Sequence, residues 1–177
     1  MTELELKFIQ VSKNNPQHCE AFRNLMLPYQ QELDAPLSND LILNYAQSCI
    51  DMQGPYDRHL ELAYSNDELA GFIYGKVDRK GQRGFIKPGY GYIMEFYVKP
   101  EHRRKGYGEK MFLRLERLFA EHGVRRIWLN TGAGGELFWR AMGFVPTGER
   151  SPDNKMPIYE KQIYRTSADK LQRIFRR

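Results

Sequence analysis

The sequence predicts an α/β fold in which a mixed sheet is flanked by helices. Runs of alternating or continuous apolar residues and runs with helical periodicity follow one another in the order β-α-α-β-β-β-α-β-α-β-β. We expect a crossover that consists of a strand at 92–98, an amphipathic helix and a parallel strand at 126–130. Crossovers between parallel strands are right-handed in nearly all proteins. We expect one domain over residues 1–164 and a basic helical tail over 165–177.

The first half of the chain supplies one strand, two helices and a hairpin. Residues 4–11 alternate apolar and polar side chains, which is typical of a strand. A helix is expected over 17–33 after Asn15 and Pro16, and Pro28 should kink or divide it. A second helix begins near Leu41, with Asp40 as a plausible cap, and stops around residues 53–55. Strands at 59–64 and 69–77 flank the turn residues 65–68.

The second half is organised around residues 92–119. A polar, glycine-rich loop is expected over 78–89, and an apolar strand over 92–98 follows it. The next helix carries one apolar stripe and stops near Gly123. After the strand at 126–130 we expect a loop over 131–135, a helix over 136–142, and closing strands at 144–146 and 158–164.

Composition narrows the class of protein. Hydrophobic residues make up 41% and charged residues 28% of the chain, as in soluble globular proteins, and no apolar run is long enough to span a bilayer. The start of the chain lacks the features of a signal peptide, and Cys19 and Cys49 lie in separate predicted helices. We therefore expect a cytoplasmic protein, and the four histidines predict no metal site because their spacing fits none.

The basic charge of the chain lies mostly at its C-terminal end. Of the net charge of +5, the segment 165–177 carries +4, which leaves +1 for the rest. A basic surface spread over the body is what nucleic-acid binding requires, so we expect no nucleic-acid partner. The tail could form a helix that packs on the body or on a second subunit of a homodimer, and we expect no membrane partner.

A glycine turn at the start of the central helix predicts an anion site. Gly106 and Gly108 let the backbone approach a ligand closely. The first N–H groups of a helix point outward at the positive end of its dipole. Arg103, Arg104 and Lys105 add positive charge beside them. Together these features favour a bound diphosphate over a solvated basic loop.

Two motifs resemble those of the GNAT superfamily of N-acetyltransferases. Val98-x-Pro100-Glu101-x-Arg103-x-x-Gly106-x-Gly108 is similar to the family's acyl-CoA signature after a strand ending in Val-x-Pro. The run 138–144, Phe-Trp-Arg-Ala-Met-Gly-Phe, is similar to the family's second motif. The resemblance implies a mostly antiparallel sheet with one splayed parallel strand pair, and acetyl-CoA as the cofactor.

The resemblance also implies which residues hold the cofactor. In the family the pantetheine arm pairs with the central strand, which points to backbone groups of Phe96 and Val98. Backbone N–H groups there could also face a developing oxyanion. Asn130 matches a position that often contacts the arm, although it equally suits a polar strand end. The implied cofactor residues are Phe96, Val98, Arg103, Arg104, Lys105, Gly106, Tyr107, Gly108, Glu109, Asn130 and Trp139.

Glu95 is the expected catalytic residue. It is a lone carboxylate in an otherwise apolar strand, which means that it is paired, exposed or functional. A carboxylate with a raised pKa could take the proton from an amine, directly or through water. The usual family tyrosine, which protonates the leaving thiolate, aligns with Trp139, and indole is no practical acid. Either another group, Tyr92, Tyr107 or water, supplies that proton, or none is needed.

An acidic segment predicts the acceptor. Between Asn24 and Asp57 there is no lysine or arginine but there are five acids, and the resemblance places this region beside the acceptor. Glu32 and Asp34 are the expected substrate-binding residues for a small cationic molecule or peptide with a primary amine. Two other interpretations remain open at this stage, a CoA-binding module without turnover and, less favoured, a nucleic-acid-binding protein.

Overall fold

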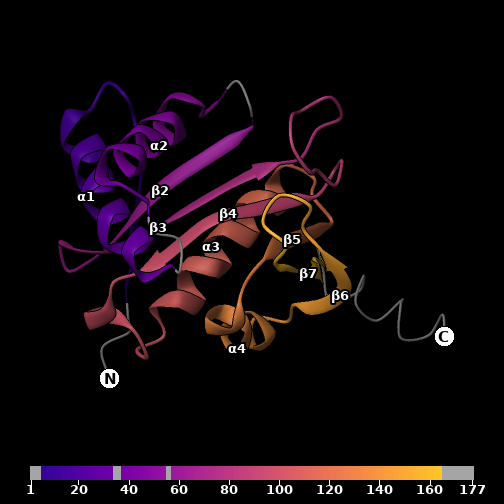
Figure 1. Ribbon diagram of the computed structural model, residues 1–177. Coiled ribbons are helices and arrows are strands. Elements are labelled where there is room, and N and C mark those ends of the chain that lie inside the picture. The colour runs from indigo at the N-terminus through magenta and orange to yellow at the C-terminus, as the bar shows by residue number, and fades with distance from the viewer. Residues whose placement is uncertain (1–4, 34–36, 55–56, 165–177) are drawn as a thin grey trace. The chain divides into compact units, whose positions relative to one another are not determined.

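The computed structural model describes residues 5–33, 37–54 and 57–164. Within them, seven strands form a mixed sheet with four α-helices, in the order that the sequence predicts (Figure 1). The strands are β1 (Lys7–Gln10), β2 (Arg58–Ser65), β3 (Glu68–Val77), β4 (Gly91–Val98), β5 (Arg126–Asn130), β6 (Val145–Arg150) and β7 (Pro157–Gln162). The helices are α1 (Pro16–Glu32), α2 (Asn39–Asp51), α3 (Tyr107–Glu121) and α4 (Ala133–Ala141), with a short 3₁₀ helix η1 (Pro100–His102). Asp34 and the tail 165–177 lie outside the described residues.

The chain forms two compact units. The first comprises residues 1–76 and 94–113, and the second comprises residues 77–93 and 114–177. Strand β4 and helix α3 each contribute residues to both units. The mixed α/β sheet predicted from the sequence is confirmed, including its parallel strand pair β4–β5. No described helix is long and apolar enough to cross a membrane.

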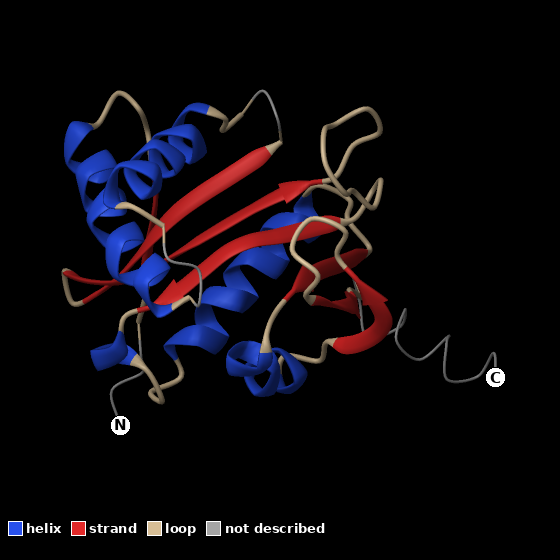
Figure 2. Ribbon diagram, in the orientation of Figure 1, coloured by secondary structure: helices blue, strands red, loops and turns tan. Residues whose placement is uncertain are grey.

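The first unit is a sheet covered by α1 and α2. Strand β1 pairs with β2 and β2 with β3, both antiparallel, and β4 is the next strand in the order. Figure 2 shows the two helices together beside these strands. Phe22 of α1 meets Phe72 of β3 edge to face, with ring centroids 5.0 Å apart. The core also contains Leu25, Met26, Ile42, Ala46, Cys49, Leu60, Leu62 and Tyr74. This packing fixes the faces that α1 and α2 turn toward the sheet.

Two expectations for these helices need correction. Pro28 lies inside α1 without dividing it, although its missing N–H removes one helical hydrogen bond. Asp40 is not the cap of α2: the Ser38 hydroxyl accepts the Leu41 N–H at 3.4 Å, and Asp40 lies in the first turn. The packed face of α1 outweighs the local preference of one proline.

A close backbone approach fixes Gly71 in the first unit. A methyl group at Gly71 would lie 2.0 Å from the carbonyl oxygen of Tyr97 in β4, so no other residue fits. The Lys99 N–H, just past β4, donates to the Ala70 carbonyl at 2.8 Å. These contacts hold the end of β4 against β3, where the chain turns into η1 and α3.

The second unit is built around Trp128 of β5. Strand β5 pairs antiparallel with β7 and β7 with β6, while the start of β4 pairs parallel with β5 at Gly91–Ile127 and Tyr92–Trp128. The Trp128 ring stacks on Tyr92 with centroids 3.9 Å apart, and its indole N–H donates to Asp78 at 2.7 Å. The buried Asp78 also accepts the Lys87 N–H, and so fastens the loop that precedes β4.

The boundaries of two later elements differ from expectation. Helix α4 starts at Ala133 and not at residue 136, so Gly134 and Gly135 belong to its first turn. Strand β6 runs over 145–150 and does not include Phe144, which is buried. Glycine is a poor helix former, and sequence propensity therefore places the start of α4 too late.

Candidate active site

Glu95 of β4 is held by tyrosines from two helices. The Tyr29 hydroxyl of α1 donates to one carboxylate oxygen at 2.5 Å, and the Tyr45 hydroxyl of α2 donates to the other at 2.7 Å. Tyr29 is also fixed by the ring of Phe72, with centroids 5.5 Å apart. Three separate elements of the first unit therefore position one carboxyl group.

Burial raises the pKa of Glu95, and the two tyrosine hydrogen bonds oppose that rise without cancelling it. The residue as a whole keeps some contact with solvent, while protein atoms crowd around its carboxyl group. Burial and the neighbouring Glu95 charge raise the pKa of Tyr45 above its ordinary range, so this hydroxyl keeps its proton and acts as a donor. A carboxylate whose pKa is raised holds a proton more readily than an ordinary glutamate, as a general base requires.

Glu32, at the end of α1, is already paired. One carboxylate oxygen accepts Arg103 Nη2 at 2.5 Å, and the other accepts the Tyr97 hydroxyl at 3.0 Å. The guanidinium of Arg103 lies over the Tyr97 ring, 5.6 Å from its centroid. Burial and the bond to Glu32 raise the pKa of Tyr97 to about 12. Of the two predicted acceptor residues, Glu32 thus lies in a three-residue cluster, and Asp34 is outside the described residues.

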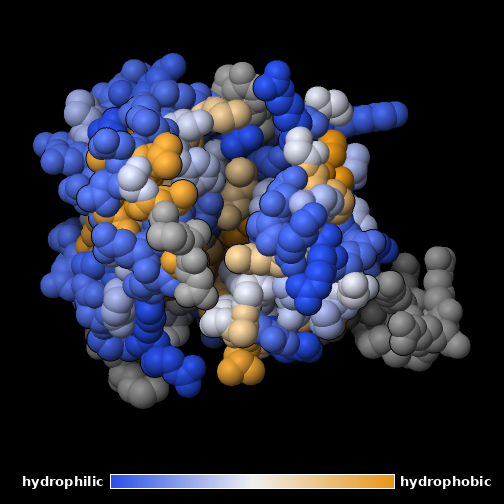
Figure 3. Space-filling model, in the orientation of Figure 1, coloured by the Kyte–Doolittle hydropathy of each residue, from blue (hydrophilic) through white to orange (hydrophobic). Residues whose placement is uncertain are grey.

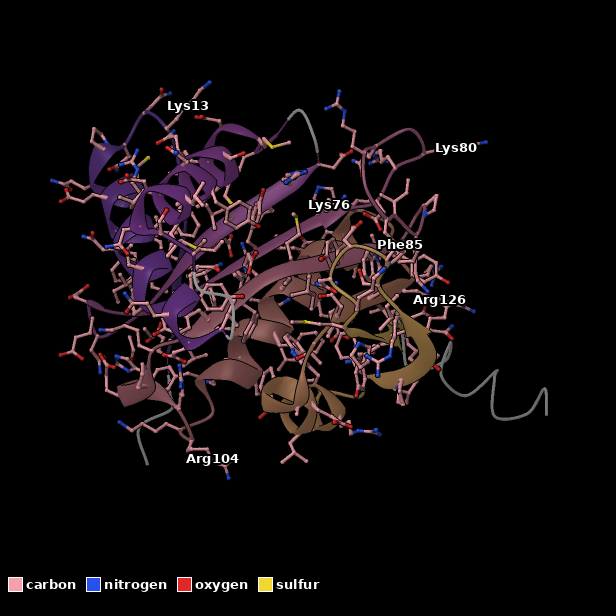
Figure 4. The ribbon with its side chains drawn as sticks, viewed as in Figure 1. Lys13, Lys76, Lys80, Phe85, Arg104 and Arg126 are labelled. Atoms are coloured by element: carbon pink, nitrogen blue, oxygen red, sulfur yellow. The ribbon has the colours of Figure 1, made fainter. Side chains whose placement is uncertain are left out.

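The loop between η1 and α3, residues 103–106, turns through two left-handed residues. Arg104 has φ of 60° and Gly106 has φ of 83°, a region that favours glycine. A methyl group at Gly106 would meet no protein atom within 4 Å. The Arg104 side chain is exposed and extends away from the protein (Figure 4). Gly106 therefore faces open space beside the start of α3.

Side chains from the same loop fasten it to its surroundings. Arg103 Nε donates to the Val98 carbonyl at 2.8 Å, and Lys105 Nζ donates to the Glu101 carbonyl at 2.7 Å. The Tyr107 ring is buried, with its hydroxyl 2.9 Å from Ser65 Oγ and its ring edge to face with His102. The Tyr107 side chain therefore anchors α3, and the residue can offer a ligand its backbone N–H.

This loop fits a diphosphate. Gly106 accepts the Lys110 N–H through its carbonyl at 3.3 Å, so the N–H groups of Tyr107, Gly108 and Glu109 precede the first intrahelical donor. Glu109 is an acid in the first turn, where it suits the helix dipole, so its part in anion binding would be its backbone N–H. The open space at Gly106 and the exposed Arg104 add room and positive charge.

In the second unit, Asn130 ends β5 within a polar cluster. Its side-chain amide donates to the Tyr92 hydroxyl at 3.3 Å, and its oxygen accepts from Asn154 at 2.9 Å. Asn154 precedes β7, so the cluster joins β5 to the segment before its sheet neighbour. These bonds give Asn130 a structural task beside the predicted contact with the pantetheine arm.

Trp139 of α4 is buried, with 8% of its surface exposed. Its ring packs edge to face with Phe138 and Phe144, at centroid distances of 4.8 and 5.4 Å. At the position where the resemblance implies a tyrosine hydroxyl, Trp139 carries an indole, which does not titrate near neutral pH. Trp139 therefore belongs to the packing of the second unit, and its predicted contact with the cofactor stays a prediction.

Tyr29 and Tyr45 are the site residues that sequence reasoning missed. In the sequence, each tyrosine is one of the apolar and aromatic residues that recur with helical spacing in its segment. No local pattern links either tyrosine to Glu95, since they are 66 and 50 positions away. The one available signal was an aromatic residue with a polar tip on an inward face, which needs a partner when buried. Within the described ranges, His, Cys, Asp and Glu form no group able to hold a metal ion.

Solved structures share this fold. A PaiA N-acetyltransferase from Thermoplasma acidophilum, in complex with coenzyme A, aligns with a TM-score of 0.63 and 18% identity over 90% of this chain and 100% of its own. An acetyltransferase of the GNAT family from Staphylococcus aureus aligns with a TM-score of 0.67 and 14% identity, over 90% and 100%. The aminoglycoside 6′-N-acetyltransferase from Enterococcus faecium aligns with a TM-score of 0.66 and 18% identity, over 91% and 99%. These likenesses concern the fold.

The family itself follows from the sequence match. No curated protein matches this chain. The family model of the Acetyltransferase (GNAT) family matches residues 19–144, which include Glu95, both tyrosines and the loop 103–106. The match covers more than half of the chain, so this protein belongs to the GNAT family of acetyltransferases and is an acetyl-CoA-dependent N-acetyltransferase.

Proposed function

We propose that the protein transfers the acetyl group of acetyl-CoA to the primary amine of a small cationic molecule or peptide, with Glu95 as the general base. The observation that carries this proposal is the Glu95 carboxylate, whose two oxygens accept the hydroxyls of Tyr29 and Tyr45. Burial raises its pKa, which makes the carboxylate a stronger base than an ordinary glutamate.

Glu95 would do the proton work of the reaction. An amine is protonated near neutral pH and cannot attack until it loses a proton. Glu95 would accept that proton, directly or through one water, and later release it to solvent. Acetyl-CoA supplies the activated acyl group as a thioester. The amine nitrogen forms the new bond to the carbonyl carbon and loses a second proton, the carbon–sulfur bond breaks, and the departing thiolate takes up one proton to leave as a thiol.

The loop 103–106 and the start of α3 would hold the diphosphate of the cofactor. The N–H groups of Tyr107, Gly108 and Glu109 lie at the positive end of α3, and Arg104 is free to add a charged contact. Arg103 and Lys105 would contribute charge from positions already fixed by carbonyl oxygens. Phe96 and Val98 would offer backbone groups to the pantetheine arm, although the Val98 carbonyl already accepts Arg103.

The leaving thiolate would take its proton from Tyr92 or from water. Trp139 has no suitable proton, and the Tyr107 hydroxyl is already engaged with Ser65.

Cys19 and Cys49 are both buried, free thiols, which fits the predicted cytoplasmic setting.

Thiol release tests the proposal. Wild-type protein is mixed with acetyl-CoA and, one at a time, a monoamine, a diamine, a polyamine and a lysine-containing peptide, and free CoA thiol is measured. We expect release with at least one class and loss of that release in Glu95→Gln. Tight CoA binding by calorimetry with no release for any amine would support a binding module instead, and no binding at all would refute both.

A further inference from the structure

Two exposed leucines continue the helix faces that carry the tyrosines. Leu33, the C-cap of α1, is 41% exposed, and Leu41 in α2 is 56% exposed. Leu33 follows Tyr29 by four positions, and Leu41 precedes Tyr45 by four. Residues four apart lie on the same side of a helix. Leu41 therefore lies one turn before Tyr45 on the same side of α2, and Leu33 is the residue that ends α1, four positions past Tyr29.

Neither leucine has an evident structural reason to be exposed. The nearby Leu37, also exposed, precedes the cap Ser38 and so occupies the position of a hydrophobic staple toward Ile42. Leu33 and Leu41 hold no such position. The space-filling view shows hydrophobic atoms gathered over α1 and α2 (Figure 3). An exposed apolar patch beside a polar site is typical of a ligand-binding surface.

Charge beside the leucines suits one ammonium group. Glu32 already accepts Arg103 and Tyr97, which offsets its charge. Asp40 lies about 100° around the helix from Leu41 and sits in the first turn of α2, where the helix dipole stabilises it. Glu95 of β4 accepts hydrogen bonds from the hydroxyls of both Tyr29 and Tyr45.

We propose, resting on the function proposed above, that the acceptor is a primary monoamine with an apolar alkyl or aromatic body. Its ammonium group lies at Glu95, between Tyr29 and Tyr45, and its body lies along Leu33 and Leu41. A second cationic group at the far end of the acceptor would have to lie against the leucines, where desolvation disfavours it. Within the predicted class of small cationic molecules and peptides, this inference favours acceptors that carry one ammonium group.

A matched pair of acceptors tests this proposal. Hexylamine and 1,6-diaminohexane share one chain and differ only in the far end, which is a methyl group in the first and an ammonium group in the second. We expect kcat/KM to favour hexylamine by at least about tenfold. Across butylamine, pentylamine and hexylamine, each added methylene should raise kcat/KM by about threefold to fourfold, as transfer of one buried methylene predicts.

A variant of Leu41 tests whether the dependence of kcat/KM on chain length arises at the leucine surface. Leu41→Ser should raise KM for hexylamine several-fold, leave kcat nearly unchanged and flatten the chain-length series. Leu137→Ser is the matched control, because Leu137 lies on α4 of the second unit and is 83% exposed. It should change none of these values.

The outcomes separate this inference from the proposed function. Preference for 1,6-diaminohexane or spermidine, or a flat chain-length series, would overturn the inference while acetyl transfer stands. No turnover of any amine would overturn the proposed function, and the inference with it. If Leu41→Ser lowers the molar mass measured by light scattering and leaves the chain-length series intact, the leucines form a subunit contact, which also refutes the inference.

Discussion

The loop 103–106 with the start of α3 and the Glu95 site belong to the same unit but are built in opposite ways. The loop presents backbone N–H groups from consecutive residues, and its dihedral angles decide its shape. The Glu95 site depends on side chains that are distant in sequence. Glu95 of β4 lies 66 positions from Tyr29 of α1 and 50 positions from Tyr45 of α2.

This contrast predicts what each region tolerates. A backbone site should withstand changes of exposed side chains such as Arg104 but not a change of its glycines. A side-chain site should respond to the loss of single oxygen atoms, since each hydroxyl and carboxylate oxygen has one assigned partner. Substitutions in the two regions should therefore differ in what they change, which is cofactor affinity in the loop and proton transfer at Glu95.

Glu95→Gln should have the largest effect. Removing a general base lowers turnover by roughly 10²-fold, while the affinity for acetyl-CoA stays near the wild-type value because the loop is untouched. Steady-state kinetics and calorimetry measure the two quantities on the same preparation. Unchanged turnover across the pH range would make Glu95 a structural residue.

Gly108→Ala should weaken acetyl-CoA by about 1–2 kcal/mol, the size of charge-assisted backbone bonds. Gly108 lies in the first turn of α3 without a positive φ, so alanine there brings no left-handed backbone strain. Gly106→Ala should weaken binding as well, and its φ of 83° should also cost about 1 kcal/mol of stability.

Gly148→Ala is the control for Gly106. Gly148 has the same φ of 83°, and a methyl group there likewise meets no atom within 4 Å. It should therefore lose similar stability in thermal unfolding and keep full affinity for acetyl-CoA. Equal losses of affinity in the two variants would show that backbone strain, and not the diphosphate contact, explains the effect.

Tyr29→Phe and Tyr45→Phe should have intermediate effects. The tyrosine hydrogen bonds lower the pKa of Glu95 against the larger rise caused by burial, so losing one of them raises that pKa further. The base acts when deprotonated, and the acidic limb of the pH–rate profile should therefore move to higher pH. A lower rate without any shift of that limb would indicate a purely structural role for the tyrosine.

Glu32→Gln should have the smallest effect. Glu32 and Arg103 are each about two-fifths exposed, and such pairs contribute less than about 1 kcal/mol. We expect KM for a cationic acceptor to rise by less than about fivefold and its salt dependence to flatten. A tenfold or larger rise would restore Glu32 as a principal contact of the acceptor.

The same contrast explains what the sequence could predict. The anion site could be predicted because glycines, basic residues and a helix start are neighbours in the chain. Glu95 could be predicted as a candidate because it is a lone carboxylate in an apolar strand. Tyr29 and Tyr45 could not be predicted, and neither could the pairing of Glu32 with Arg103 across 71 positions, because the packing of α1 and α2 against β4 and the loop 103–106 creates these contacts.

The tryptophan residues of the protein are confined to one of its two units, which makes their fluorescence specific for that unit. Its two tryptophans, Trp128 and Trp139, both lie in the second unit and are nearly inaccessible to water. Tyr29, Tyr45 and Tyr97 belong to the first unit. Fluorescence excited at wavelengths that tryptophan absorbs and tyrosine does not therefore reports on the second unit alone, without any added label. During denaturation it can be compared with a circular-dichroism signal from the helices, and coincident curves would mean that the units unfold in one cooperative step.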